Sequence, residues 1–276
     1  MNALEIRGLT KRRGDFALQG LDLTLPAGCI MGLIGENGAG KSTTIRLILN
    51  ALSRDGGTVA VYGKDNRALT PLEREDIGAV LDEVGLPEYM TARQIGRMMA
   101  GIFARWQPEV YRDYLRRLAL PEDKTFRDFS RGMKMKLGLA AALSHQPKLL
   151  LLDEATSGLD PVVRDEILTI FADFTRDEEH AVLISSHIVS DLEKICDYIA
   201  FLHKGRLLLC EEKDRLTEEY GILRGGTDGI APAAVCGRHA TPYGTEYLVR
   251  RDAVPAGMVL GQVNIEDLFV FMAKEV

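Results

Sequence analysis

A glycine-rich loop that ends in a lysine and a hydroxyl residue is the segment of this chain best suited to chemistry. In order, it contains Gly35, Glu36, Asn37, Gly38, Ala39, Gly40, Lys41, Ser42 and Thr43. Glycines let backbone N–H groups approach phosphate oxygens, and a helix that begins at such a loop adds positive potential. A lysine at this spacing reaches the β- and γ-phosphates, and the following hydroxyl can bind Mg²⁺. The loop therefore predicts a site for a nucleoside triphosphate.

Two acids and a histidine form a second set of reactive side chains. Asp153 and Glu154 follow the apolar run 149–152, and His187 follows the run 181–186. Such runs predict buried strands of a parallel sheet, and ligands bind at the carboxyl ends of these strands. Beside a phosphate loop, we expect Asp153 to bind Mg²⁺ through water and Glu154 to polarise the water that attacks the γ-phosphate. We expect His187 to contact the γ-phosphate and orient that water.

The elements around the loop provide the context that the motif needs. The apolar run 29–34 predicts a buried strand before the loop. After the loop, Ile45, Ile48, Leu49 and Leu52 recur at helical spacing. The sequence thus predicts a strand, a phosphate-binding loop and a helix in direct succession.

Composition limits the kind of protein that the chain can be. Its 276 residues are 46% apolar and 27% charged, which is typical of a globular protein with one large domain or a domain with an appendage. We expect a cytoplasmic protein, since no run reaches the length of a membrane span and residues 1–5 lack the plan of a signal peptide. A net charge of −6 argues against broad nucleic-acid binding. The four cysteines form no CxxC pair, so neither a disulfide framework nor a zinc site is expected.

The chain divides into three stretches of different pattern. Short alternating runs up to residue 62 predict strands, whereas residues 86–145 contain only helical patterns. From residue 148, apolar runs alternate with helical segments and predict a mostly parallel sheet. After about residue 220 the pattern changes to loops, a strand at 246–250 and an amphipathic helix at 265–274. The sequence therefore predicts an α/β core with a helical insert and a small C-terminal extension.

Four motifs in a fixed order carry a resemblance to a known family. They are GENGAGKST, FSRGMK, LLLLDEATSGLDP and SSH. FSRGMK taken alone is a helix start with Ser130 as the N-cap. In this order the set resembles ABC transporter ATPases over residues 1–225. The resemblance implies a P-loop NTPase core with an N-terminal antiparallel β subdomain, a helical subdomain at about 86–145 and a small extension at 226–276.

The resemblance also implies a dimer that encloses two ATP molecules with Mg²⁺. Each site would combine Lys41, Ser42, Asp153, Glu154 and His187 of one subunit with residues of the other. Those opposing residues would be Ser130 and Gly132, and Asp160 would lie at the seam between subunits. Because the chain carries a single set of motifs, it needs a second ATPase subunit, identical or different. A separate membrane permease is implied as well, which would hold the chain at the inner face of the cell membrane.

Three positions differ from the usual pattern of the family. Arg131 stands where the commonest signature has its first glycine. The aromatic residue that stacks on adenine is missing after Lys11, where Arg13 stands, and we expect Phe16 to replace it. Asp82 falls where the family has a glutamine that meets Mg²⁺ and senses the membrane partner. An aspartate can still serve a metal through water, so Asp82 is a third expected metal residue beside Ser42 and Asp153.

Three classes of function are compatible with these motifs. The favoured one is an ATP-hydrolysing subunit that drives a permease, resembling the ATPases of bacitracin- and lantibiotic-type exporters. The alternatives are a soluble ABC-type mechanoenzyme and a nucleotide-binding regulatory module without hydrolysis. Neither the cargo nor the direction of transport follows from the sequence. The helix 265–274 presents one apolar stripe, formed by Ile265, Leu268, Phe269 and Met272, for core packing or for a partner.

Overall fold

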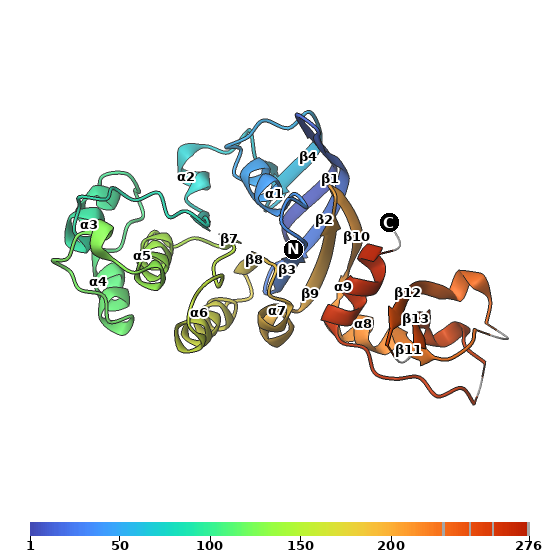
Figure 1. Cartoon of the computed structure of the whole chain (residues 1–276). Coiled ribbons are helices and arrows are strands. Elements are labelled where there is room, and N and C mark those ends of the chain that lie inside the picture. Colours follow the sequence, from blue (N-terminus) through green and yellow to red (C-terminus); the bar gives the residue numbers. More distant parts are fainter. Residues whose placement is uncertain (228–229, 243, 256, 275–276) are drawn as a thin grey trace.

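Three β-sheets organise the chain in the computed structural model, which describes residues 1–227, 230–242, 244–255 and 257–274 (Figure 1). The first sheet is antiparallel and has the order β2-β1-β4-β5. Its strands are β1 (Asn2–Arg13), β2 (Phe16–Pro26), β4 (Gly56–Val61) and β5 (Lys64–Asp65). The predicted alternation is present where Leu4 and Ile6 of β1, and Leu21, Leu23 and Leu25 of β2, are buried and the residues between them are not. The predicted N-terminal antiparallel subdomain is confirmed.

The central sheet has the order β10-β9-β3-β8-β7-β6. Its strands are β3 (Ile30–Ile34), β6 (Ile77–Val80), β7 (Leu149–Asp153), β8 (Ala181–Ser186), β9 (Tyr198–His203) and β10 (Arg206–Glu212). All neighbours are parallel except β9 and β10, which are antiparallel. This arrangement confirms the predicted mostly parallel α/β sheet.

Both faces of the central sheet are covered, because successive side chains of a strand point to opposite faces. In β7, Leu149 and Leu151 pack with the antiparallel sheet and α1 (Lys41–Ile48). Leu150 and Leu152 pack with the opposite layer, which contains α6 (Pro161–Phe174) and α7 (Val189–Ile195). Buried on both faces, these strands show a continuous apolar run instead of alternation.

The helical insert lies at one end of the molecule (Figure 1). It contains α3 (Ala92–Ala100), α4 (Pro108–Arg117), the 3₁₀ helix η1 (Phe126–Asp128) and α5 (Arg131–Leu143), and α2 (Pro71–Arg74) precedes β6. Local capping explains where these helices begin. Thr91 and Gln94 form a capping box at α3, a proline opens α4, and the Ser130 side chain accepts from Met133 N at 3.3 Å.

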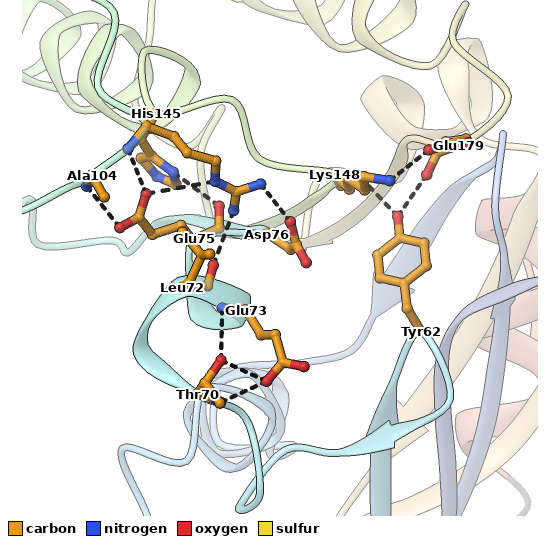
Figure 2. Close-up of polar contacts among 11 residues, drawn as sticks. Tyr62, Thr70, Leu72, Glu73, Glu75, Asp76, Ala104, His145, Lys148 and Glu179 are labelled. Atoms are coloured by element: carbon orange, nitrogen blue, oxygen red, sulfur yellow. Dashed lines mark hydrogen bonds and ion pairs between the residues drawn. The ribbon is translucent and has the colours of Figure 1, made fainter.

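A polar cluster fixes the insert to the core where β6 begins (Figure 2). The buried Glu75 carboxylate accepts hydrogen bonds from the N–H groups of Ala104 and Arg105 at 2.8 and 2.9 Å. Arg105 Nη1 donates to Asp76 Oδ1 at 2.8 Å, and His145 Nδ1 lies 3.1 Å from the Glu75 carbonyl oxygen. Burial acts to raise the pKa of Glu75, but the two N–H donors and Arg105 outweigh it, so its pKa is lowered.

The C-terminal part forms a third sheet, with the order β11-β13-β12. It comprises β11 (Tyr220–Arg224), β12 (Val235–Thr241) and β13 (Gly244–Arg250), together with α8 (Lys213–Glu219), η2 (Pro232–Ala234), η3 (Arg251–Ala253) and α9 (Ile265–Lys274). The predicted strand 246–250 and helix 265–274 are confirmed, whereas the sequence pattern predicts neither β11 nor β12. The sheet begins at Tyr220, ahead of residue 225, so the division at 225 stays a prediction.

Helix α9 packs inside the molecule. Ile265 and Leu268 are fully buried, and Phe271 is nearly so. Phe269 lies against Phe201 of β9, with 5.4 Å between ring centroids. The apolar stripe thus joins the C-terminal part to the core, which favours core packing over a partner contact. Within the described residues, no helix combines the length and apolar character needed to cross a membrane.

Candidate active site

The glycine-rich loop runs from the end of β3 to the start of α1. Gly40 precedes α1 with φ of 114°, and no described side chain caps the helix. A Cβ on Gly40 would lie 2.8 Å from Phe16 Cζ, and one on Gly35 would lie 2.4 Å from the Leu202 carbonyl oxygen. Close packing excludes a side chain at both positions, and the dihedral angle of Gly40 also favours glycine. The first N–H groups of α1 are therefore left for an anionic ligand.

Lys41 lies across the loop. Its side chain is 5% exposed, and its Nζ donates to the carbonyl oxygens of Gly35 and Glu36 at 2.7 and 3.3 Å. The same Nζ lies 3.1 Å from Glu154 Oε1. The loop lysine and the predicted catalytic acid, which are far apart in the sequence, are thus in direct contact.

Glu154 follows β7 in a left-handed backbone conformation, with φ of 52°. Its N–H lies 3.1 Å from both the carbonyl oxygen and the Oγ of Ser185 on β8. Ser185 Oγ donates to Asp153 Oδ1 at 2.7 Å. Ser185 therefore positions both acids, a role that the sequence motifs do not indicate. The signal available was a hydroxyl residue at the end of a buried strand.

His187 completes a chain of contacts through Glu154. Its Nδ1 lies 2.7 Å from Glu154 Oε2. The Glu154 side chain is 13% exposed and lies between the cation of Lys41 and the imidazole. Lys41, Glu154 and His187 come from the ends of three adjacent strands, β3, β7 and β8.

A hollow of about 390 Å³ opens over Lys41 and Glu154, while His187 lies outside its lining. Its lining residues are Arg13, Phe16, Glu36, Asn37, Gly38, Gly40, Lys41, Ser42, Thr43, Asp82 and Glu154. Phe16 opens β2 and lies at the rim beside Gly40, where a flat base can stack. Arg13 also lines the hollow, although the sequence analysis did not assign it to the site. Most of the predicted residues are thus brought together by the fold.

Other predicted residues lie outside this hollow. Ser130 caps α5, and Gly132 lies in its first turn. Asp160 caps α6, where its Oδ1 accepts from the N–H groups of Val162 and Val163 at 3.2 and 3.0 Å. One chain alone does not bring these three residues to the phosphate loop.

Asp82 has a partner within the chain. Its Oδ1 lies 2.9 Å from Arg131 Nη2, and both side chains are about half exposed, at 53% and 54%. Two of the three positions that differ from the family pattern, Asp82 and Arg131, therefore form an ion pair with each other. Asp82 also lines the hollow, so it contacts both the nucleotide site and the start of α5.

The residues present fit Mg²⁺ bound together with phosphates. Within the described ranges, no three His, Cys, Asp or Glu side chains cluster as a protein-only metal site. Asp153 is 2% exposed at the end of β7, and Ser42 lies in the first turn of α1. Buried Glu154 Oε1 is paired with Lys41 Nζ at 3.1 Å but accepts no hydrogen bond from a described residue. One carboxylate and one hydroxyl are typical of Mg²⁺ sites in which water and substrate phosphates complete the coordination.

Comparison with known proteins agrees with this site. The model of the ABC transporter family matches residues 18–157. The chain is 32% identical over 218 residues to the ABC transporter ATP-binding protein YtrB of Bacillus subtilis (strain 168), covering 79% of this chain and 74% of the relative. It is 32% identical to the bacitracin transport ATP-binding protein BcrA of Enterococcus faecalis, covering 74% of this chain and 68% of BcrA.

Solved structures show the same fold. The structure of an ATP-binding subunit of an ABC transporter superposes with a TM-score of 0.69 at 26% identity, covering 78% of this chain and 92% of that one. Together with the family match and the sequence relatives, this likeness identifies the chain. It belongs to the ATP-hydrolysing, ATP-binding subunits of ABC transporters.

Proposed function

We propose that this chain hydrolyses ATP at the hollow above β3, β7 and β8, with Glu154 as the general base. The observation that carries the proposal is the chain of contacts from Lys41 to Glu154 at 3.1 Å and from Glu154 to His187 at 2.7 Å. A base must lie within hydrogen-bond reach of the proton that it takes, and an acid at the edge of the phosphate loop meets that condition. His187 then orients the attacking water and contacts the γ-phosphate.

The remaining groups bind and orient the nucleotide. Lys41 leaves Glu154 and turns to the β- and γ-phosphates, while the loop N–H groups cradle the phosphate oxygens. Phe16 stacks on the adenine. Ser42 and Asp153 hold Mg²⁺, with Asp82 reaching it through water. When bound, the ion neutralises charge on the phosphates as the terminal phosphate is transferred.

The second half of each site comes from another ATPase subunit. Ser130 and Gly132 at the start of α5 lie outside the hollow of their own chain, and a helix N-terminus is suited to a phosphate. Beside Asp160, the apolar Val162 is 78% exposed, as expected for a residue that a partner covers. We therefore propose a dimer with two ATP molecules between the subunits.

The dimer powers a separate membrane permease that exports its cargo. Two relatives carry names of transport functions: bacitracin transport for BcrA and lantibiotic transport for SrtF of Streptococcus pyogenes, which is 31% identical over 214 residues. The chain then lies on the cytoplasmic side of the cell membrane and is held there by the permease.

Substitution Glu154→Gln tests the catalytic proposal. The amide keeps the side-chain shape but lacks the basic oxygen, so turnover should fall at least about 100-fold while ATP affinity remains. Steady-state phosphate release and binding of a fluorescent ATP analogue measure the two quantities. Glu179→Gln is the matched control, because Glu179 also pairs with a lysine, at 2.5 Å, but lies outside the hollow. Parental turnover in Glu154→Gln would remove Glu154 as the base.

A further inference from the structure

Two loops beside the proposed active site leave the sheet next to each other. Residues 154–160 join β7 to α6, and His187 and Ile188 join β8 to α7. The two strands are adjacent and parallel, and α6 packs against α7. The first loop ends in Asp160 at the proposed subunit seam, and the second carries His187.

Arg164, in the first turn of α6, contacts the loop 154–160 and helix α7. Its Nη2 donates to the Leu159 carbonyl oxygen at 3.2 Å. Its Nε lies 3.5 Å from Oδ2 of Asp191, which is in the first turn of α7. A single guanidinium therefore touches the loop that precedes α6 and the helix that follows His187.

The Asp191 side chain is buried, the Arg164 side chain is partly exposed, and the hydrogen bonding of this pair is incomplete. The Asp191 side chain is 2% exposed and that of Arg164 is 26% exposed. Neither Arg164 Nε nor Asp191 Oδ2 forms a hydrogen bond with a described residue. Burying two charges is unfavourable unless their geometry is excellent, and apolar side chains would stabilise a helix contact at least as well. A stabilising role alone therefore does not require charged side chains at these two positions.

We infer that Arg164 and Asp191 are positioning residues that couple the place of Asp160 to that of His187. The inference rests on the proposed function, in which a partner subunit contacts Asp160. When that contact displaces Leu159, the Arg164 guanidinium moves with the Leu159 carbonyl oxygen. Because the planar guanidinium also contacts Asp191, this movement shifts the start of α7. His187 then moves relative to Glu154. The unused hydrogen-bonding capacity of Nε and Oδ2 allows the pair to tighten as the subunits close.

A double-mutant cycle on turnover tests this coupling. Asp191→Asn removes one charge with little change in size, and Arg164→Gln removes the guanidinium and its charge. Each should lower turnover at saturating ATP by about tenfold, and the double variant should be no slower than either single one, since one contact is lost in all three. The affinity of the isolated chain for Mg²⁺-ATP should stay at the parental value. Effects on turnover that multiply in the double variant would overturn the coupling.

The matched control uses another ion pair on the same helix. Arg117 Nη2 of α4 lies 3.1 Å from Asp173 Oδ2 of α6, away from both loops. Arg117→Gln and Asp173→Asn should keep parental turnover. A fall in thermal stability or ATP affinity that accounts for the slower turnover of Asp191→Asn would show a merely structural role and would also overturn the inference.

Amide hydrogen exchange of the nucleotide-free chain provides a readout that needs no hydrolysis. Asp191→Asn should raise exchange in residues 156–160, although the substitution lies on the other helix, whereas Asp173→Asn should not. Parental exchange in this loop would contradict the coupling. If Glu154→Gln keeps parental turnover, the proposed function fails, and the exchange experiment still decides whether Arg164 and Asp191 couple the two loops.

Discussion

At the scale of single residues, Glu154 is the group on which the site converges. It is a non-glycine residue in the left-handed region, which costs on the order of 1–3 kcal/mol and persists only where the surroundings enforce it. The enforcing groups are the carbonyl and hydroxyl oxygens of Ser185, each 3.1 Å from the Glu154 N–H. The strained backbone of Glu154 therefore lowers the stability of the fold somewhat, and it places the carboxylate between Lys41 and His187.

Binding of the adenine base should depend on Phe16, which lies at the rim of the hollow beside the loop glycines. Loss of one stacking ring costs about 1–3 kcal/mol, so Phe16→Ala should weaken ATP binding by roughly 5- to 150-fold. Phe16→Trp keeps a ring and should bind ATP close to parental affinity. Isothermal titration with Mg²⁺-ATP measures both variants. Unchanged affinity in the alanine variant would discard the stacking role.

At the scale of elements, the insert is held to the core by a contact as well as by its two chain connections. Glu75, just before β6, binds the loop between α3 and α4 through two backbone N–H groups. His145, just after α5, stacks on Phe103 of that loop, with ring centroids 4.2 Å apart, and lies against the Glu75 carbonyl. This cluster sets the orientation of the insert, and hence of α5, relative to the phosphate loop.

The Glu75 carboxylate should stabilise the fold in a pH-dependent way. Its pKa is lower in the folded chain than in the unfolded one, so its contribution is present above the unfolded pKa and is lost as pH falls through the folded value. Glu75→Gln leaves one N–H donor poorly paired, and should lower the free energy of unfolding at pH 7 by about 1–3 kcal/mol. Urea titrations should show the difference shrinking below about pH 4.5. A constant difference over that range would contradict the assignment.

At the scale of the whole molecule, the site described in one chain is half of the proposed one. Residues that would contact the γ-phosphate from the opposite side, Ser130 and Gly132, begin α5 on the insert and not at the hollow. The C-terminal part is tied to the core by α9, through buried Leu268 and the contact of Phe269 with Phe201. Closure of two such molecules would complete each hollow.

ATP binding should cause dimerisation when hydrolysis is blocked. In Glu154→Gln, ATP should shift the chain from monomer to dimer in analytical ultracentrifugation at micromolar concentration. Adding Ser130→Arg should abolish the shift, because a bulky side chain at the α5 N-terminus blocks the approach of the phosphate. Ser53→Arg changes an exposed serine outside the hollow and serves as the control. Absence of any shift in Glu154→Gln would count against a homodimer and in favour of a different second subunit.

Features that depend only on neighbours along the chain can be predicted from the amino-acid sequence. The phosphate loop is a run of consecutive residues, so its glycines, Lys41 and Ser42 predict their chemistry without the fold. Helix α9 was predicted with its observed limits, because its apolar period is local. Strand β12 was missed because it lies at a sheet edge and only Gly237 in it is fully buried, so it lacks an apolar alternation.

Contacts between residues that are far apart in the sequence depend on the fold of the whole chain. Strand order places the end of β8 between the ends of β3 and β7, and this brings His187 and Ser185 to Glu154. The contact of Asp82 with Arg131, and that of Arg164 with Asp191, likewise joins segments that no local pattern relates. Pairing of strands and packing of helices depend on the free energy of the whole core, which a local stretch of sequence does not contain.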